Sequence, residues 1–256
     1  MSKIKNKSKS DISVVLYAYG ETQALAATMA TALRAITYAR EQGLGIDARM
    51  VASRLDGRLK EWVAEFLPEG WQLVDARTSL IGATRRAGVE GAQGAHIAMI
   101  EAGDMWPRTW LADAHAAARD AEAEAVWHPQ IVFRVGCDHG DGRPYWTQFQ
   151  PDTLAQRLDA AHLLVAEPYA DGGFAPRGLL ERVPFPTEDV SRGWGHVNWW
   201  WACRVATAGY HHRTIPRSFH YRLLKSTGEP FGKPAAPSHH RVGPIVPERS
   251  ATGAGS

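Results

Sequence analysis

Short apolar runs alternate with amphipathic helical patterns along the first hundred residues, and this alternation restricts the possible folds most strongly. Residues 12–17 read ISVVLY, a continuous apolar and β-branched run that is typical of a strand covered on both faces. Thr22 can cap a following helix that ends near Gly43. The apolar residues of this helix share one stripe: Leu25, Met29, Leu33 and Ile36.

The same succession of strand and helix is repeated further along the chain. Strands are expected near 46–52, 71–74 and 95–100, with a helix before each of the last two. This alternation predicts an α/β fold in which right-handed crossovers build a mainly parallel central sheet with helices on both faces. In such sheets ligands bind at the carboxyl ends of the strands.

Composition narrows the class of protein. The 256 residues are 45% hydrophobic and 22% charged, and the net charge of +2 is too small to indicate nucleic acid as a partner. No apolar run approaches the roughly 18 residues of a membrane span, and the basic start MSKIKNKSKS has no signal-peptide core. We therefore expect a cytoplasmic protein in which Cys137 and Cys203 are reduced and are core or incidental residues. The stretch CDHGD (137–141) matches no common zinc pattern and predicts a surface turn.

The sequence divides into three parts. Residues 1–10 predict a disordered basic leader, residues 11–228 a single domain, and residues 229–256, rich in Pro, Gly, Ser and His, a flexible tail. Within the domain, Pro107 is well placed as the first residue of an Ala-rich helix. From about 126 onward Gly, Pro and aromatic residues interrupt short apolar runs, which indicates irregular strands and loops over one end of the sheet.

Two carboxylates follow the strand expected at 95–100. Glu101 and Asp104 are three residues apart on a turn, so both can reach one ion. Hard cations such as Mg²⁺ or Mn²⁺ prefer oxygen ligands and keep positions open for substrate phosphates. An ordinary polar turn at a strand end is the alternative interpretation.

A tryptophan-rich stretch, GWGHVNWWWACR, occupies residues 193–204. Two glycines around Trp194 let the backbone approach a ligand closely, and an exposed indole offers a flat apolar face for a sugar ring or a base. The alternative is core packing, which we expect for at least two of the three tryptophans at 199–201, because a helix buries one side.

His220 follows a short apolar strand in IPRSFHYR (215–222). It is either a structural histidine or a nitrogen ligand that completes an ion site with the two carboxylates. Arg222 and Lys225 could then neutralise a phosphate leaving group.

These stretches resemble motifs of the family 2 glycosyltransferases, which have the nucleotide-diphosphosugar transferase (GT-A) fold. LYAYGE (16–21) is similar to the family's Pro-Thr-Tyr-Asn-Glu strand end and keeps Tyr19 and Glu21. RRAGVEGAQGAHIAMIEAGDMWPRTWL (85–111) is similar in spacing to the family's Arg-Asn-x-Gly, Ala-x-Gly and Asp-x-Asp-Asp motifs. GWGHVN with Arg204 resembles the Gly-Trp-Gly-Gly-Glu-Asp stretch of galactosyltransferase-like relatives.

The resemblance covers roughly residues 11–225 and implies a nucleotide-sugar half, 11–106, and an acceptor half, 107–228. It implies Mn²⁺ or Mg²⁺ as cofactor, held by Glu101, Asp104 and His220. It also implies that Trp194 and Trp199 bind the acceptor. The residues that it assigns to the nucleotide sugar are Tyr17, Tyr19, Glu21, Asp56, Arg85, Glu101 and Arg222.

The chain also departs from the family pattern. Gly103 stands where the second motif aspartate is expected, so one metal ligand is absent. Asn198 stands at the position of the catalytic carboxylate, and an amide cannot accept a proton at neutral pH. Another base must then serve, and the nearby candidates are Asp189, Glu188 and His196.

The sequence therefore predicts an inverting, metal-dependent glycosyltransferase that moves a sugar from a nucleotide-diphosphate donor to a small-molecule, glycan or peptide acceptor. Two alternatives stay open. One is a catalytically weakened relative that binds a nucleotide sugar or a partner without efficient transfer. The other is a different chemistry on the same fold, such as nucleotidyl transfer.

Overall fold

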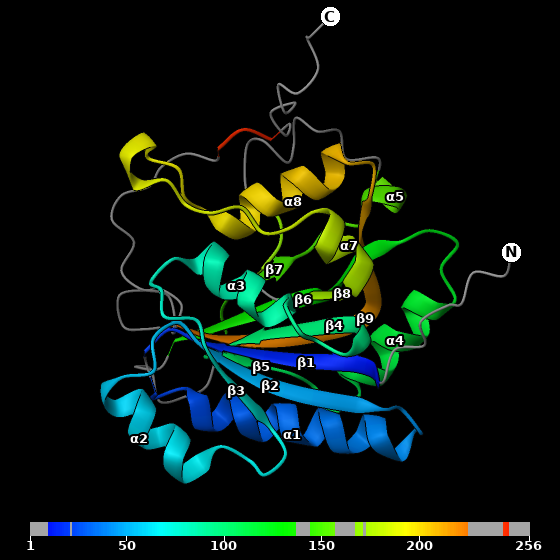
Figure 1. The fold of residues 1–256 in the computed structure, drawn as a ribbon. Helices are drawn as coiled ribbons and strands as arrows, with labels where there is room; N and C mark the ends of the chain where they lie inside the picture. The colour runs from blue at the N-terminus through cyan, green and yellow to red at the C-terminus, as the bar shows by residue number, and fades with distance from the viewer. Residues whose placement is uncertain are drawn as a thin grey trace, which may run out of the picture.

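A mixed sheet with helices on both faces forms the body of the protein (Figure 1). The computed structural model describes residues 10–20, 22–136, 144–156, 167–170, 173–224 and 243–245. The elements up to the middle of the chain are β1 (Ser10–Ala18), α1 (Leu25–Glu41), β2 (Ile46–Ala52), α2 (Gly57–Phe66), β3 (Gln72–Asp75), α3 (Ile81–Val89), β4 (Gly94–Glu101), β5 (Asp104–Met105) and α4 (Trp110–Arg119). The remaining elements are β6 (Ala125–Gly136), β7 (Pro144–Phe149), α5 (Thr153–Gln156), β8 (Gly173–Pro176), α7 (Arg177–Arg182), the 3₁₀ turn η2 (Val190–Arg192), α8 (Val197–Thr207) and β9 (His211–Leu224).

The first half of the sheet is parallel, as the alternation of strands and helices predicts. Strand β1 lies between β2 and β4, and β3 adds to the outer edge of β2, all in parallel register. Tyr17 is opposite Val51 on one side and Glu101 on the other, so the carboxyl ends of these strands meet at one edge. This edge is where the predicted nucleotide-sugar residues of the first half are expected.

The second half of the sheet is mixed. Strand β8 is antiparallel to both β4 and β6, so β6 again runs in the direction of β4. Strand β9 is parallel to β6, and the two-residue strand β5 is antiparallel to β9, with Asp104 opposite Arg222. The last strand of the domain is thereby brought to the turn that follows β4.

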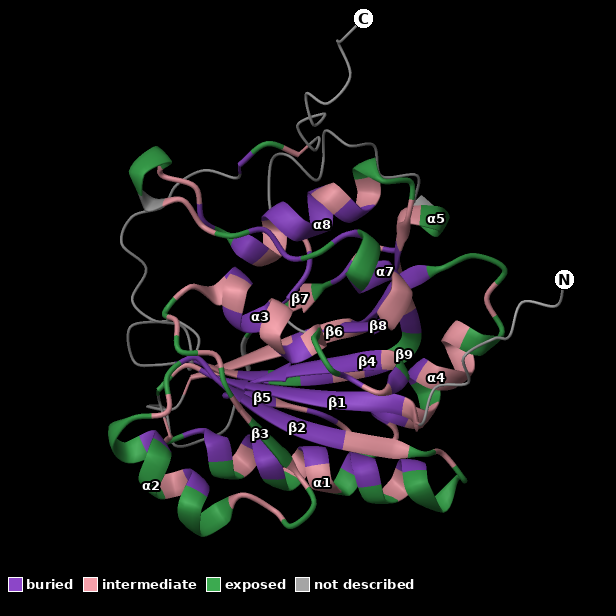
Figure 2. Ribbon diagram, viewed as in Figure 1, coloured by how far each residue is buried: buried purple, intermediate pink, exposed green. Residues whose placement is uncertain are grey.

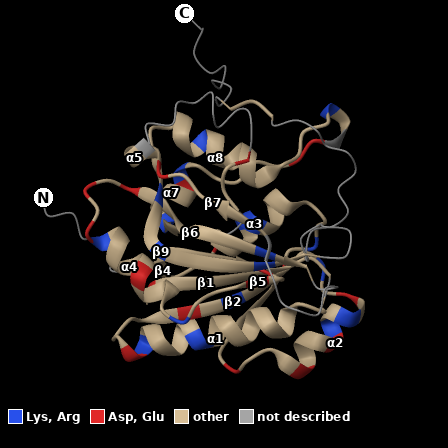
Figure 3. Cartoon of the chain, turned by 180° about the vertical axis from the view of Figure 1, so that it is seen from behind, with Lys and Arg blue, Asp and Glu red and all other residues tan. Residues whose placement is uncertain are grey.

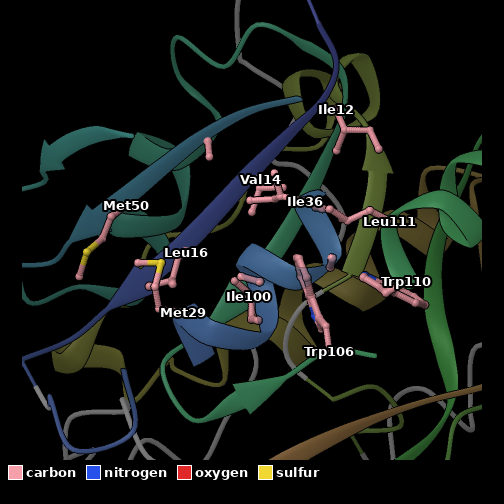
Figure 4. Close-up of a cluster of buried hydrophobic side chains, with 14 of the residues drawn as sticks. Ile12, Val14, Leu16, Met29, Ile36, Met50, Ile100, Trp106, Trp110 and Leu111 are labelled. Carbon is pink, nitrogen blue, oxygen red and sulfur yellow. The ribbon is translucent and has the colours of Figure 1, made fainter. Parts of the chain in front are cut away.

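Two apolar layers cover the sheet, and the alternation of side chains along β1 decides which residues enter each. Ile12, Val14 and Leu16 pack into the layer under α1, α2 and α4, a part of which Figure 4 shows. Val15 and Tyr17 point to the other face, into the layer under α3, α7 and α8. Buried positions accordingly fill the central strands in Figure 2.

Several local expectations differ from the structure. Helix α1 begins at Leu25, and no side chain caps its first turn. Thr22 contributes only its backbone carbonyl oxygen, which accepts the Leu25 N–H at 3.1 Å. Helix α4 begins at Trp110, because the chain first makes a turn in which Pro107 O accepts the Trp110 N–H. Residues 243–245, in the predicted tail, contact α8: Trp200 Nε1 donates to Pro244 O at 3.0 Å.

Across the described ranges, none of the helices combines the length and apolar character needed to cross a bilayer.

Truncating the centre of β1 tests the packing of the larger layer. Leu16→Ala should lower the free energy of unfolding by about 2–5 kcal/mol, because Leu16 is fully buried and its loss leaves a cavity. Urea denaturation followed by circular dichroism measures the change. Leu73→Ala, on the half-exposed edge strand β3, should cost less than about 1 kcal/mol. Equal losses in the two variants would contradict the assigned packing.

Candidate functional site

Tyr19, Arg85 and Glu101 meet at the carboxyl ends of β1 and β4. Glu101 is the last residue of β4 and is paired with Arg85, and both side chains are almost completely buried. The Tyr19 hydroxyl lies 3.5 Å from Glu101 Oε1. The structure therefore brings together three of the residues that the sequence assigns to the nucleotide sugar, although they come from three different elements or loops.

Tyr17 supports this group from beneath. Its hydroxyl donates to Arg85 O at 3.1 Å, and the Arg85 guanidinium lies over its ring at 5.2 Å. Burial raises the pKa of Tyr17 well above its usual value. Tyr17 is therefore a neutral packing and hydrogen-bonding residue inside the site.

A second ion pair joins the turn after β4 to the last strand. Arg222 Nε and Nη2 donate to the two oxygens of Asp104, each at 2.7 Å, and Arg222 Nη2 also lies 4.0 Å from Glu101 Oε2. Arg85, Glu101, Arg222 and Asp104 thus form a buried row of alternating charges. Because each charge has an opposite neighbour, the row compensates much of the cost of removing these groups from water.

The three predicted metal ligands all contact other side chains of the protein. Guanidinium groups occupy the oxygens of Glu101 and Asp104, and His220 packs edge-on against Trp110, 4.3 Å between ring centroids. Burial, followed by the Arg222 charge, lowers the pKa of His220 to about 3, so its ring is neutral. No group of three or more His, Cys, Asp or Glu side chains in the described ranges is arranged to hold a metal ion. The donor set does not fit a metal in this arrangement.

The remaining donor-side residues lie at the edge of the site. Asp56 is exposed at the start of α2, immediately beyond the carboxyl end of β2, and makes no side-chain cap for that helix. Glu21 and the CDHGD stretch lie outside the described residues. Figure 3 shows acidic and basic positions interspersed along the chain in this view, which agrees with the small net charge.

Two of the candidate bases hold the backbone in place. Glu188 accepts the N–H groups of Ile81 and Gly82, at 2.5 and 3.0 Å, and so anchors the start of α3. Asp189 accepts the Ser191 hydroxyl at 2.6 Å and the Ser191 N–H at 3.1 Å. These hydrogen bonds, led by the Ser191 hydroxyl, lower the pKa of Asp189. A carboxylate stabilised in this way has a reduced tendency to take a proton.

Helix α8 carries the other predicted acceptor-side residues. His196, exposed and in the left-handed backbone region at φ 50°, precedes the helix, and its ring lies 5.8 Å from that of Trp199. Trp200 and Trp201 are buried, as the core-packing alternative expects, whereas Trp194 and Trp199 are partly exposed. The Arg192 guanidinium covers one face of the Trp194 ring, 4.8 Å from the ring centroid.

Asn198 and Trp199 line a small cavity between α8 and the sheet. The cavity has a volume of about 20 Å³, and its wall includes Arg85, His128 and Tyr169. His128 Nε2 and His212 Nδ1 are 2.9 Å apart, and His212 Nε2 lies 3.2 Å from Ala202 O. Because Nε2 of His212 donates to the carbonyl, its Nδ1 accepts from His128.

Sequence reasoning missed this group because nothing in the local pattern marks it. His128 lies in the first half of β6, Tyr169 in a short loop segment and His212 at the start of β9. His128 and His212 are brought together by the parallel pairing of β6 and β9, in which Val126 is opposite His212. A pair of histidines in two separate strands gives no spacing signal along the chain.

Breaking the second ion pair tests its energetic role. Arg222→Gln should lower the free energy of unfolding by about 3–5 kcal/mol, because the Asp104 charge stays buried without its partner. Asp104→Asn combined with Arg222→Gln should lose less than the sum of the single variants, since no buried charge of this pair is left. Urea denaturation of the single and double variants measures the coupling. Additive losses would show that the two side chains act independently.

Comparisons with known proteins indicate the fold. Neither a family model nor a curated protein matches the chain by sequence. Among solved structures, S. aureus TarS 1–349 is similar, with a TM-score of 0.56 and 14% identity over 83% of this chain and 60% of that one. For TarS 1–349 in complex with UDP the TM-score is 0.57 and the identity 12%, over 84% of this chain and 60% of that one. For the complex with UDP-GlcNAc the TM-score is 0.57 and the identity 14%, over 83% of this chain and 58% of that one. This chain therefore spans about 60% of the length of TarS 1–349, and it has the GT-A-like glycosyltransferase fold that its sequence predicts.

Proposed function

We propose that this protein is a glycosyltransferase that moves a sugar from a nucleotide-diphosphate donor to a hydroxyl-bearing acceptor. The observation that supports this most is the convergence of Tyr19, Arg85 and Glu101 at the carboxyl ends of β1 and β4 in a GT-A-like fold. Crevices at this edge are where open α/β sheets bind ligands. The complexes of TarS with UDP and UDP-GlcNAc make a uridine-diphosphate sugar the first donor to test.

The donor would lie across the edge formed by β1, β2 and β4. Asp56, exposed beyond β2, can accept hydrogen bonds from the base or ribose hydroxyls. Tyr19 would lie beside the diphosphate. The guanidinium groups of Arg85 and Arg222, held by their carboxylate partners, would place fixed positive charge near the leaving group.

The acceptor would approach from the side of α8. Trp194 and Trp199 are both partly exposed, and a sugar ring or another flat apolar group would pack on Trp199 or on the face of Trp194 that Arg192 leaves uncovered. The acceptor hydroxyl would attack the anomeric carbon from the face opposite the leaving diphosphate, so the anomeric configuration inverts. Holding both reactants in line supplies much of the rate enhancement.

The proposed reaction includes no step at a metal ion, since the predicted ligands Glu101 and Asp104 bind arginines and His220 packs on Trp110. In place of a metal ion, the guanidinium groups of Arg85 and Arg222 would stabilise the negative charge of the leaving diphosphate. Both groups stay protonated throughout.

Donor binding and nucleotide release test the function directly. In calorimetry the protein should bind members of a panel of UDP-, GDP- and TDP-sugars. It should release the nucleoside diphosphate slowly when water is the acceptor and faster when acceptor extracts are added. Asp56→Ala should weaken binding by about ten- to a hundredfold, because a hydrogen bond to a charged group contributes about 1.5–3 kcal/mol. Asp113→Ala, exposed on α4, is the matched control and should bind the donor unchanged. Lack of binding across the panel would refute the proposal.

Chelation tests the assignment of the charge-stabilising groups. Nucleotide release should change by less than about tenfold when EDTA replaces Mn²⁺ or Mg²⁺, whereas losing a metal that stabilises the leaving group by several kcal/mol would cost more than about a hundredfold. Release rates measured at equal ionic strength give the comparison. A strict requirement for added metal would mean that Glu101 or Asp104 exchanges its arginine for the ion.

A catalytically weakened relative is the second candidate. It is favoured by Asn198 at the position of the expected base and by the structural hydrogen bonds of Glu188 and Asp189. The two candidates differ in one measurement. The weakened relative binds a nucleotide sugar in calorimetry but releases no nucleoside diphosphate with any acceptor extract.

A further inference from the structure

A second pocket lies where α1, the turn after β5 and strand β9 meet. Its volume of about 580 Å³ is typical of sites that hold small ligands. The residues that line it include Thr31, Arg34, Met105, Arg108, Phe219 and Tyr221. No described residue lines both this α1–β9 pocket and the cavity beneath α8. The function proposed above therefore leaves the α1–β9 pocket without a role.

Aromatic rings form one wall of the α1–β9 pocket. Phe219 and Tyr221 are two residues apart on β9 and therefore share one face of the sheet, whereas Arg222 points to the other face. The ring centroids of Phe219 and Tyr221 are 5.5 Å apart, and the Phe133 ring lies 5.4 Å from that of Tyr221. Tyr221 is nevertheless 38% exposed. Apolar ring surface thus stays accessible to a flat ligand.

The turn after β5 is held against α1. The Gly103 N–H donates to Thr28 Oγ1 at 2.9 Å, and the Trp106 N–H donates to Thr31 Oγ1 at 3.3 Å. Trp106 also lines the pocket, and it is buried in the apolar layer that Figure 4 shows. The floor of the pocket is therefore in place before any ligand binds.

Two exposed guanidinium groups line the pocket and have no acidic partner. Arg34 Nε donates to Ala30 O at 3.2 Å, and the Arg108 guanidinium lies over the Tyr38 ring, 4.9 Å from its centroid. Within the described ranges, neither arginine has a carboxylate partner. None of the described residues that line the pocket is acidic. The positive charge at this pocket is therefore not neutralised by the protein.

Helix α1 brings the two arginines to the same part of the pocket. Arg34 and Tyr38 are four residues apart on α1, so they lie one turn apart on the same side of the helix. Arg108 packs over Tyr38 and is thereby placed beside that side of the helix. Two like charges repel, and an anion between them replaces the repulsion with attraction. The planar guanidinium fork of arginine suits a phosphate or a carboxylate in particular.

We propose that the α1–β9 pocket binds a small organic anion, a flat apolar ring that carries a phosphate or carboxylate group. The ring packs on Phe219 and Tyr221, and the anionic group binds Arg34 and Arg108. The inference goes beyond the proposed function, because it concerns a second ligand. No described residue that the sequence assigns to the nucleotide sugar lines this pocket.

Calorimetry with matched probes tests both parts of the ligand. Naphthyl phosphate or naphthoate should bind at least about tenfold more tightly than neutral naphthol, since hydrogen bonds to a charged group are the stronger ones. The comparison of the two anions shows which anionic group the pocket prefers. Inorganic phosphate, which lacks the ring, should bind more weakly than naphthyl phosphate. Equal affinities for naphthol and for both anions overturn the inference.

Replacing both arginines tests where the anion binds. Arg34→Gln combined with Arg108→Gln should abolish the difference in affinity between the preferred naphthyl anion and naphthol, while naphthol binding is unchanged. Arg40→Gln combined with Arg119→Gln removes the same charge from two other exposed positions and is the matched control. In the control the difference should persist. A difference that also persists in the first double variant overturns the inference.

Removing part of the aromatic wall tests where the ring binds. Tyr221→Ala should weaken the binding of the naphthyl anion and of naphthol alike, by about two- to tenfold, because both use this ring. Phe66→Ala, at a half-exposed position on α2, is the control and should bind both probes unchanged. Circular dichroism of each variant shows whether it is folded. Unchanged binding to a folded Tyr221→Ala variant overturns the inference.

A crystal structure of the unmodified protein with the naphthyl anion locates the site without any substitution. The ring should lie against Phe219 and Tyr221, with the anionic group at Arg34 and Arg108. A probe bound elsewhere overturns the inference. Binding of nucleotide sugars, measured on the same variants, should be unaffected by the loss of the two arginines. Absence of nucleotide-sugar binding in the unmodified protein refutes the proposed function and leaves this inference standing.

Discussion

The buried row of charges formed by Arg85, Glu101, Arg222 and Asp104 is the interaction on which the rest of the site depends. It joins the helix before β4, the end of β4, the following turn and the last strand. Two of its members, Asp104 and Arg222, are 118 residues apart in the chain. Removing one partner leaves a charge without compensation in the core, so the row fixes the position of all four segments together.

This arrangement explains how two differently built halves share one sheet. The first half is a parallel succession of β3, β2, β1 and β4, whereas the second half returns through the antiparallel strand β8. The turn after β4 then pairs with β9, which brings Arg222 to the carboxyl end of the parallel half. Arg222 of β9 thereby reaches this edge, and residues of α8 line the cavity on the neighbouring face of the sheet.

The same interaction changes the chemistry expected at this edge. Carboxylates with free oxygens attract a hard cation, but Asp104 already accepts a bidentate pair of hydrogen bonds from Arg222, and Glu101 is paired with Arg85. In the proposed reaction the fixed positive charge at this edge is therefore carried by guanidinium groups.

The sequence by itself determined the parallel half of the fold, because the alternation of apolar residues along ISVVLY and the following helical stripe is set by backbone geometry over a few residues. It also predicted Tyr19, Arg85 and Glu101 as members of one site, and the structure places these three side chains together. Only the tertiary structure decided that Glu101 and Asp104 bind arginines, and that His128, Tyr169 and Asn198 share a cavity. These partners meet through strand pairing between distant segments, for which the local periodicity of the chain holds no signal.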